Sequence, residues 1–246
     1  MVTMTPNLTT SAKQPASLTV VVPTLNEELR IGRCLRSIGT GRDVEVVVSD
    51  GGSTDPTLEI VRSTRPDAVV VCGSPGRGGQ LNRGAAAASS GRLLFVHADC
   101  ILPVGWFDAV MGALDDERCV LATFRLHTEP TDGGRPGFWH RFWLSLLDLR
   151  SRGWGLPYGD QGFSLRREVF DSLGGFPDIP LMEDIALARN CRRNGRIRRL
   201  PQAMRTTARR FERNPIRSRL VLAAFPTLFR LGVPPAALAR WYGTAR

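Results

Sequence analysis

The sequence predicts an α/β protein built on a mostly parallel, Rossmann-like sheet flanked by helices. Short apolar runs rich in β-branched residues recur through the first hundred positions. Segments with helical spacing of apolar residues lie between these runs, and polar or glycine-rich stretches follow them. With 246 residues, 42% of them hydrophobic and 23% charged, the chain is in the globular range and long enough to bury a full core.

Four apolar runs are the expected strands: Leu18–Val22, Val44–Val48, Ala68–Val71 and Leu93–Val96. Runs that are apolar throughout are typical of parallel strands buried on both faces. The helices expected between them are Glu27–Ile38, Asp55–Ser63 and Gly79–Ser89. Ser53 and Thr54 are suitable N-cap residues for the second helix. This alternation indicates βαβ units with right-handed crossovers and helices on both faces of the sheet.

The second half of the chain is less regular. Helices are expected over Val104–Leu114, Phe138–Leu149 and Glu183–Arg193, a strand over Val120–His127, a polar turn over Thr128–Pro136, and a loop entering a strand over Tyr158–Leu165. Phe138–Leu149 has a strongly aromatic face, which favours core packing; contact with a membrane interface or a lipidic acceptor is the alternative. Two apolar helical stretches, Leu220–Leu231 and Pro235–Tyr242, are expected in the tail.

Charge is unevenly distributed along the chain, whose formal net charge is +10. Residues 189–246 contain 15 arginines and one acid, Glu212, whereas residues 1–188 carry 18 basic and 22 acidic residues. Such a basic tail predicts an anionic partner, which can be phosphate, a membrane surface or nucleic acid. A bias toward arginine codons would explain the choice of arginine over lysine, but not the missing acids.

Cysteine usage and the absence of apolar spans point to a cytoplasmic protein. The five cysteines are widely spaced without a CxxC pair, which argues against a disulfide framework and a zinc site. We therefore expect buried free thiols in a reducing compartment. The first residues lack an apolar signal core, and no window reaches the ~18–20 apolar residues of a spanning helix. Peripheral contact with the inner face of the cell membrane stays open.

Polar segments follow the four expected strands. Pro23-Thr24-Leu25-Asn26-Glu27 follows the first, Ser49-Asp50-Gly51-Gly52-Ser53-Thr54-Asp55 the second, Gly76-Arg77-Gly78-Gly79-Gln80 the third, and His97-Ala98-Asp99 the fourth. Each segment alone is equally typical of a turn or a helix start. Because the carboxyl ends of parallel strands meet at one edge, where ligands bind, the four together predict a ligand site.

The residue types in these segments suit a nucleotide. The Asp50 carboxylate can accept a hydrogen bond from a base N–H, and Gly51 and Gly52 allow a close approach to the backbone. The segment around Arg77 matches neither a Walker A motif nor GxGxxG, yet a glycine-rich turn that opens a helix can hold a diphosphate. Asp99 can hold a divalent cation that bridges two phosphates. The alternative for Asp99 is a helix N-cap or a satisfied buried carboxylate.

The ordered combination, with Asn82 and Gly84 in the third helix, resembles family 2 glycosyltransferases, nucleotide-sugar enzymes of the GT-A fold. The resemblance covers about residues 17–200. The sequence is most similar to a small soluble bacterial subgroup of this family. That subgroup has His-Ala-Asp in place of Asp-x-Asp and a later Gly-Asp-Gln-Gly, which is Gly159-Asp160-Gln161-Gly162 here. The resemblance implies a UDP-hexose donor site formed by Pro23, Thr24, Asn26, Glu27, Asp50, Gly51, Gly52, Arg77, Gln80, Asn82, His97, Ala98 and Asp99.

The same resemblance implies a metal and a catalytic base. Asp99, with His97, would hold Mg²⁺ or Mn²⁺, and His97 brings less negative charge than the acid it replaces. Inverting transfer needs one carboxylate to take the proton of the acceptor hydroxyl. We expect Asp184 to be this base, with Glu183 orienting the acceptor and Asp160 as the second choice. Without the upstream motifs, the Glu183-Asp184 pair would be read as first-turn acids favoured by the helix dipole.

The predicted function is therefore inverting, metal-dependent transfer of a hexose to an unknown hydroxyl acceptor, with a lipid-linked acceptor as one option. The expected donor is a UDP-sugar, with a GDP-sugar as the second choice. The predicted organisation is a disordered lead-in (1–16), a GT-A domain (17–212) with nucleotide-binding (17–100) and acceptor (101–212) halves, and a basic helical tail (213–246). No feature indicates the oligomeric state.

Two other functions are compatible with parts of the sequence. A nucleotidyltransferase acting on sugar phosphates normally has a basic, glycine-rich loop after its first strand, which is absent here. A non-enzymatic protein that binds an anionic surface or nucleic acid through the arginine-rich tail is the other alternative, but no specific nucleic-acid reader motif is present. Among Arg205, Arg209, Arg210 and Arg213, the choice is between phosphate binding and a solvated charged face.

Overall fold

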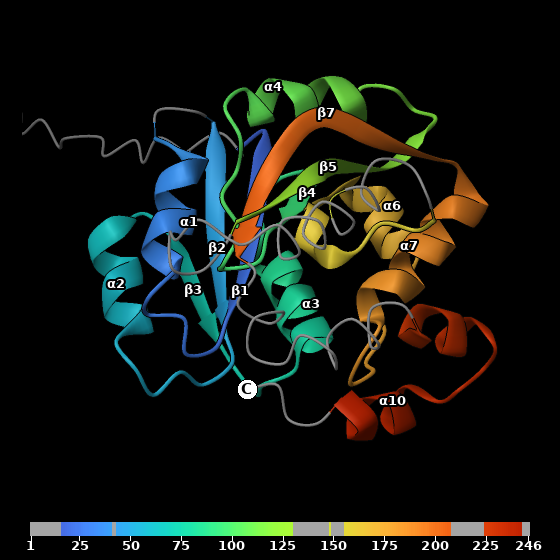
Figure 1. Cartoon of the computed structure of the whole chain (residues 1–246). Helices are drawn as coiled ribbons and strands as arrows, with labels where there is room; N and C mark the ends of the chain where they lie inside the picture. The colour runs from blue at the N-terminus through green and yellow to red at the C-terminus, as the bar shows by residue number, and fades with distance from the viewer. Residues whose placement is uncertain (1–15, 41–42, 130–147, 149–154, 208–223, 243–246) are drawn as a thin grey trace, which may run out of the picture.

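The computed structural model describes residues 16–40, 43–129, 148, 155–207 and 224–242. This part of the chain forms a seven-stranded sheet in the order β3-β2-β1-β4-β6-β5-β7, with helices on both faces (Figure 1). The strands are β1 (Leu18–Thr24), β2 (Val44–Asp50), β3 (Val69–Cys72), β4 (Arg92–Phe95), β5 (Cys119–Glu129), β6 (Phe163–Arg166) and β7 (Arg196–Thr207). Strand β6 is antiparallel to both β4 and β5, and the other pairs are parallel. The predicted mostly parallel α/β sheet is confirmed.

The helices form two layers. One layer contains α1 (Ile31–Ile38), α2 (Thr57–Thr64) and α4 (Trp106–Leu114); the other contains α3 (Arg77–Ala87), α6 (Arg167–Ser172) and α7 (Glu183–Asn194). The alternation along β1 explains the division, because Val20 and Val22 belong to the first core and Val21 to the second. All three valines are fully buried, as expected for a central parallel strand.

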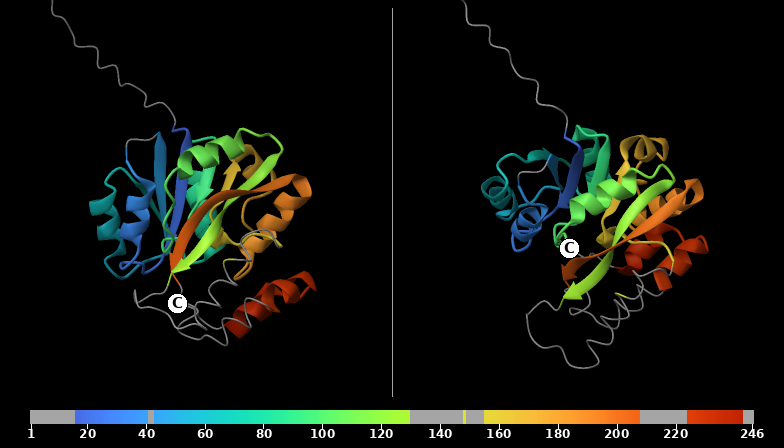
Figure 2. Two further views of the ribbon diagram at one scale, coloured as in Figure 1. Left: turned by 45° about the horizontal axis from the view of Figure 1, so that its top comes forward. Right: turned by 90° about the horizontal axis from the view of Figure 1, so that it is seen from above.

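The tail packs on the second layer. Residues 224–230 are helical, and α10 (Pro235–Tyr242) follows them. Phe225 and Leu238 are buried in the same core as α3 and α7. In Figure 2 these helices lie on the side of α7, away from α1 and α2. The two expected tail helices are thus confirmed where the chain is described.

Several predicted boundaries were wrong. The first helix begins at Ile31 and not at Glu27, and α2 begins at Thr57 without Ser53 or Thr54 as its cap. Strand β3 is not buried on both faces: it is an edge strand, and Val69 is 39% exposed. Each of these errors arises where a tertiary contact, and not the local pattern, decides the structure.

Other segments agree more closely with the prediction. The expected helix over 183–193 is α7, which ends before Gly195, and the loop at 158–165 enters β6 through the short 3₁₀ turn η1 (Gly159–Gln161). The expected helix at Val104 begins at Trp106. Strand β7 and helix α6 were not predicted. Phe138–Leu149, apart from Asp148, and the turn from residue 130 lie outside the described residues.

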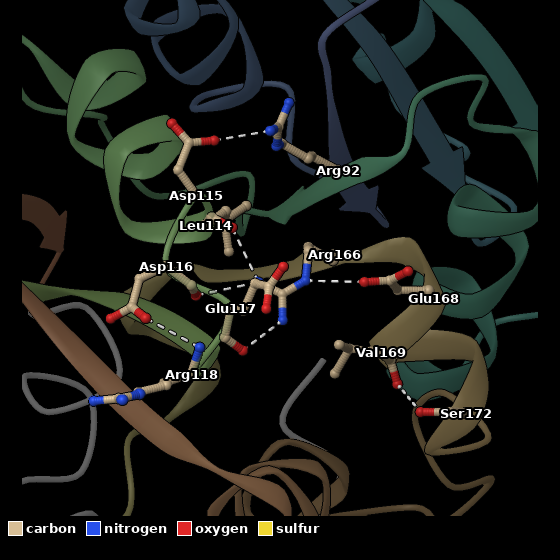
Figure 3. A network of polar contacts seen from close by, with 10 residues as sticks. All are labelled: Arg92, Leu114, Asp115, Asp116, Glu117, Arg118, Arg166, Glu168, Val169 and Ser172. Carbon is tan, nitrogen blue, oxygen red and sulfur yellow. Dashed lines mark hydrogen bonds and ion pairs between the residues drawn. The ribbon is translucent and has the colours of Figure 1, made fainter.

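Two adjacent arginines hold the C-terminal ends of two helices. Arg166 donates from Nη1 to the carbonyl oxygen of Leu114, at 3.0 Å, and from Nη2 to that of Glu117, also at 3.0 Å (Figure 3). Arg167 donates to the carbonyl oxygens of Ala85 (3.1 Å) and Ala88 (2.8 Å) at the end of α3. Carbonyl groups at helix C-termini carry negative partial charge and mostly lack an intrahelical partner, so the guanidinium groups satisfy both needs. The Ala85 carbonyl oxygen also accepts the N–H of Ala88, at 3.2 Å.

Replacing Arg166 by Ala is expected to lower the free energy of unfolding by about 2–3 kcal/mol, because the carbonyl groups at the end of α4 lose a charged donor. Urea unfolding measures this loss. Arg166 pairs with Arg92 at the start of β4, so nucleotide binding at the opposite edge of the sheet should not change. Arg62→Ala, at an exposed arginine of α2, is the control and should change stability by less than about 0.5 kcal/mol. An equal effect of both variants would contradict the capping role.

Candidate active site

The carboxyl ends of β1 to β4 meet at one edge of the sheet. Thr24 pairs with Asp50, and Asp50 with Cys72, so three strands end in register. The N–H of Val96 bonds to the carbonyl oxygen of Val21 at 3.0 Å, which places the segment after β4 beside the same edge. The four polar segments therefore start from a common edge of the sheet, where parallel α/β proteins bind ligands.

Asp50 holds the loop that follows β2. Its Oδ1 accepts hydrogen bonds from the hydroxyl groups of Thr24 (3.1 Å) and Ser53 (2.5 Å), and its Oδ2 accepts from the N–H groups of Gly52 and Ser53 (both 2.8 Å). The residue is 1% exposed. Burial acts to raise the pKa of Asp50, but the hydrogen bonds from Ser53, Gly52 and Thr24 outweigh it and leave the pKa below its ordinary value.

This arrangement uses the acceptor positions of the Asp50 carboxylate within its own loop. A hydrogen bond from a nucleotide base, as expected from the sequence, would have to displace one of these four donors. Asp50 thus holds the loop in place, and its contact with a base stays a prediction. Gly52 and Asn26 form the exposed rim above it.

The loops after β1 and β2 are joined by backbone and side-chain hydrogen bonds. The N–H of Asn26 donates to Ser53 Oγ at 2.9 Å, and the N–H of Thr54 donates to Asn26 Oδ1 at 2.8 Å. The N–H of Glu27 donates to Thr57 Oγ1 at 2.8 Å. Asn26 has φ 55°, a left-handed conformation that asparagine tolerates better than most residues. Ser53 and Thr54 are used in this junction, which explains why they do not cap α2.

Gln80 closes the space beneath these loops. Its Nε2 donates to the carbonyl oxygens of Thr24 (2.8 Å) and Ser49 (3.0 Å), and the residue is 5% exposed. A β-carbon on Gly51 would lie 3.0 Å from the Gln80 amide, so glycine is needed for this contact. Gln80 therefore connects α3 to the ends of β1 and β2.

A second set of contacts, here called the α3–α7 seam, joins α3 to the segment 175–184. Asn82 donates from Nδ2 to the Phe176 carbonyl oxygen at 2.8 Å, and its Oδ1 accepts the Phe176 N–H at 2.9 Å. Arg77 forms an ion pair with Glu183, whose side chain is 2% exposed. A β-carbon on Gly78 would lie 2.8 Å from the Pro177 carbonyl oxygen. The sequence predicted that Arg77 and Asn82 contact the nucleotide-sugar. In the structure both residues make contacts within the α3–α7 seam.

Phe176 fixes the seam to the sheet. Its ring meets Phe95 edge-on with centroids 5.0 Å apart, and its centroid lies 5.7 Å from that of Phe170 and 6.5 Å from that of Phe163. These rings come from β4, α6 and β6. Edge-to-face and offset contacts of this kind stabilise a core beyond the area they bury. The start of α7 is therefore held at a fixed place relative to the strand ends.

Asp184 and His97 lie close to the same glycine, Gly159. Asp184 Oδ2 accepts the N–H of Gly159 at 2.8 Å, and Oδ1 accepts the N–H of Ile185 at 2.7 Å. A β-carbon on Gly159 would lie 3.3 Å from Asp184 Oδ2 and 3.0 Å from His97 Nε2. The structure thus brings together one predicted metal ligand and the predicted base. Asp184 is 8% exposed.

Asp99 and Asp160 lie near one buried thiol. Cys100 Sγ is 3.7 Å from both Asp99 Oδ1 and the Asp160 carbonyl oxygen. Burial, followed by the negative charges of Asp99 and Asp160, raises the pKa of Cys100 well above its ordinary value. Cys34 lies beneath the same turn, with Sγ 3.6 Å from the His97 carbonyl oxygen. All five cysteines are free thiols, as predicted. The prediction that they are buried is wrong for Cys72, which is exposed at the end of the edge strand β3.

The side chains of Asp99 and His97 suit a metal site that the protein and a bound diphosphate form together, and not one that the protein forms alone. Within the described residues, no group of three or more His, Cys, Asp and Glu side chains is arranged to hold a metal ion. Asp99 offers a half-buried carboxylate, which suits a hard cation, and His97 precedes it by two positions. Since Mg²⁺ takes ~six ligands, diphosphate oxygens and water would have to complete the shell.

Sequence reasoning missed Arg83. Its Nη2 donates to the carbonyl oxygens of Asp50 (3.1 Å) and Ser74 (3.4 Å), which ties α3 to the loops after β2 and β3. A β-carbon on Gly73 would lie 2.6 Å from the Arg83 guanidinium. Its position three residues after Gln80, on the same helix face, was the signal that could have identified it.

Comparison with known proteins agrees with this geometry. The glycosyl transferase family 2 model matches residues 19–174. The chain therefore belongs to glycosyl transferase family 2, and the resemblance seen in the strand-end motifs is confirmed.

Solved structures share the fold over most of the chain. The mannosyltransferase PcManGT from Pyrobaculum calidifontis, in complex with GDP-Man and Mn²⁺, has a TM-score of 0.63 at 23% identity, covering 94% of this chain and 69% of that one. Glucosyl-3-phosphoglycerate synthase from Mycobacterium tuberculosis, in complex with Mn²⁺, UDP and phosphoglyceric acid, has a TM-score of 0.59 at 26% identity, covering 89% and 80%. S. aureus TarS 1-349 has a TM-score of 0.58 at 20% identity, covering 92% and 69%. The GT-A fold is confirmed.

A curated relative matches a shorter segment. A 4,4'-diaponeurosporenoate glycosyltransferase of Staphylococcus aureus (strain bovine RF122 / ET3-1) is 37% identical over 89 residues. That segment is 34% of this chain and 24% of the relative. Among the helices that the structure describes, none has the length and apolar character needed to span a bilayer.

Replacing Asp50 by Asn is expected to weaken the acid dependence of stability. Because the pKa of Asp50 in the folded chain is lower than the ~3.9 of an unfolded aspartate, the ionised group contributes stability above that value. This contribution is lost as pH falls through the folded-state pKa. Urea unfolding between about pH 6 and pH 3 should therefore show a smaller loss in Asp50→Asn than in the wild type.

The control for this measurement is Asp171→Asn, at an exposed aspartate of α6. Its acid dependence should follow that of the wild type. Parallel curves for Asp50→Asn and the wild type would contradict the role of the ionised Asp50 carboxylate in the loop.

Proposed function

We propose that the protein is an inverting, metal-dependent glycosyltransferase that moves a hexose from a UDP-sugar to a hydroxyl acceptor. The observation that carries this proposal is the convergence of His97 and Asp184 at Gly159. One side chain follows β4, at the end that would hold the metal and diphosphate, and the other begins the helix that would hold the base. Donor and acceptor chemistry would meet between them.

The nucleotide would lie over the rim formed by the loops after β1 and β2. Asn26 and Gly52 are exposed there, whereas Thr24 and Asp50 are buried beneath and hold the backbone in place. The diphosphate would lie toward the N-terminus of α3, an eleven-residue helix whose dipole favours anions. The complexes of TarS with UDP and of glucosyl-3-phosphoglycerate synthase with UDP and Mn²⁺ support a UDP-sugar donor for this chain.

Asp99, with His97, would hold Mg²⁺ or Mn²⁺ against the diphosphate. When bound, the cation would neutralise negative charge as the diphosphate leaves. Within the chain, His97 takes part in the geometry whether or not it ligates, because its Nε2 lies beside Gly159 and limits the space there. The half-buried Asp99 supplies the charge that His97 lacks.

Asp184 would act as the base. Its carboxylate would take the proton of the acceptor hydroxyl as the acceptor oxygen bonds to the anomeric carbon and the bond to the diphosphate breaks. The N–H groups of Gly159 and Ile185 donate to its two oxygens and orient the carboxylate. Glu183 is paired with Arg77 and would position the start of α7. Asp160, beside Cys100, stays the alternative base.

The acceptor would be a lipid-like hydroxyl compound at the inner face of the cell membrane. The support is the name of the curated relative, whose substrate, 4,4'-diaponeurosporenoate, is lipid-like. The matched segment is a third of this chain.

Asp184→Asn is expected to lower kcat by at least about 100-fold, because the amide cannot accept the proton. UDP binding should stay within a factor of two to three of the wild type. The matched control is Asp160→Asn, which should retain most of the activity. A larger loss of kcat in Asp160→Asn than in Asp184→Asn would transfer the role of base to Asp160.

Asp99→Ala is expected to abolish the dependence of UDP affinity on Mn²⁺. Calorimetric titration of UDP with and without Mn²⁺ measures the metal contribution in the wild type and the variant. Asp108→Ala, at an exposed aspartate of α4, serves as the control. If Mn²⁺ strengthens UDP binding equally in all three proteins, the metal is not held by Asp99.

A donor screen tests the activity as a whole. Nucleotide release from UDP-, GDP- and TDP-sugars, with and without Mn²⁺, includes the hydrolytic background and so needs no known acceptor. We expect release from a UDP-hexose that depends on the metal. Release from none of the donors, together with no UDP binding, would overturn the proposed function.

A further inference from the structure

A cavity outside the proposed active site lies between α1, the segment leading into α4, and the end of β7. Its volume is about 510 Å³. Figure 1 shows these three elements around the same region of the fold. The lining combines Arg33, Arg36 and Arg205 with apolar residues that include Ile101, Leu102 and Val104. No acidic side chain belongs to the lining. The cavity is therefore both basic and apolar.

The charge of this cavity is largely uncompensated. Arg33 and Arg36 are exposed and lie three residues apart on α1, so their side chains leave the same helix face. Neither forms an ion pair with any residue in the described part of the chain. Arg205 pairs with Glu129 at 3.2 Å but keeps half of its side chain exposed. The N-terminus of α4, at Gly105 and Trp106, adds a positive partial charge.

The apolar residues of the cavity lie on a segment, 101–104, whose backbone is hydrogen-bonded to neighbouring elements. Val104 is 99% exposed. The backbone groups of Ile101 and Arg205 exchange two hydrogen bonds, of 2.8 and 3.0 Å, and the N–H of Leu102 donates to Ser37 Oγ at 3.0 Å. The segment is thus fixed to both β7 and α1. A single exposed valine is ordinary, but beside three guanidinium groups it makes the surface amphipathic.

We propose that this cavity docks the protein on an anionic membrane, with the arginines on lipid phosphates and Val104 in the interfacial layer. Guanidinium groups bind phosphate oxygens in pairs, and each basic residue near an anionic leaflet adds to the attraction. A nucleic acid fits the lining less well, because its one aromatic residue, Trp106, is 3% exposed and offers no stacking face.

The cavity lies close to the proposed active site but contains none of the active-site residues. Arg205 precedes Thr206, whose side chain hydrogen-bonds Cys100, the neighbour of Asp99. The docked surface would lie directly behind the turn that contains His97 and Asp99. An acceptor dissolved in the membrane would then reach this edge of the sheet over a short path.

Sedimentation with vesicles tests the proposal. The full chain is mixed with vesicles of phosphatidylcholine alone or with phosphatidylglycerol added. We expect the wild type to bind only the anionic vesicles. The variants Arg33→Ser/Arg36→Ser and Val104→Asp should each lose about ten-fold or more in partition coefficient. The matched control is Arg62→Ser/Arg118→Ser, which removes two exposed arginines elsewhere and should lose much less.

Three outcomes would overturn the proposal. One is equal binding of the cavity variants and their control. Another is loss of binding in Leu231→Asp, at an exposed tail residue, but not in Val104→Asp, which would transfer docking to the tail. The third is that inorganic phosphate stabilises the wild type but not Arg33→Ser/Arg36→Ser, while the wild type does not bind vesicles. That result would make the cavity a site for soluble anions. UDP binding, measured in parallel, should be unchanged, so failure of docking and failure of the transferase proposal are distinguishable.

Discussion

The α3–α7 seam is the constraint on which the site depends. Asn82 satisfies both backbone groups of Phe176, and no other side-chain type of that length offers a donor and an acceptor together. Removing the amide would leave a buried N–H and carbonyl oxygen without partners, which costs more than a hydrogen bond adds. Because Phe176 is also packed among three other rings, a shift of this segment would disturb the core at the same time.

The seam also determines where the predicted base lies. Glu183 is buried, and its ion pair with Arg77 joins the first turn of α7 to the first turn of α3. Asp184 is the next residue, so its position follows from the pair. The close approach requires small residues: a β-carbon on Gly175 would lie 2.7 Å from Asn82 Oδ1, and one on Gly84 would lie 2.4 Å from Val21.

The parts of the fold that local patterns determine were predictable. Buried parallel strands are apolar throughout, and polar residues at their ends share an edge, so β1, β2 and β4 and the site edge were recognisable. Strand β7 was not, because arginines and Pro201 replace the usual apolar pattern and its stability comes from long pairing with β5. The ligand contacts of Asn82, Arg77 and Asp50 stay predictions. Their contacts within the chain were not predictable, since a sequence shows a polar group near a site but not which protein group it meets.

The arginine-rich composition of the C-terminal part is a poor guide to anion binding. Strand β7 is at the edge of the sheet, and its exposed Arg196 and Arg198 make that edge unfavourable for pairing with another strand. Arg192 and Arg193 lie in the last turn of α7, where a positive charge complements the helix dipole. Much of this charge therefore has a structural reason. Arg36 lies in the last turn of α1 and shares this reason, whereas Arg33 does not. Both come from the part of the chain in which acids outnumber bases, and both line the cavity where an anion has a place to bind. Local geometry, and not the sum of charges, identifies the anionic partner's site.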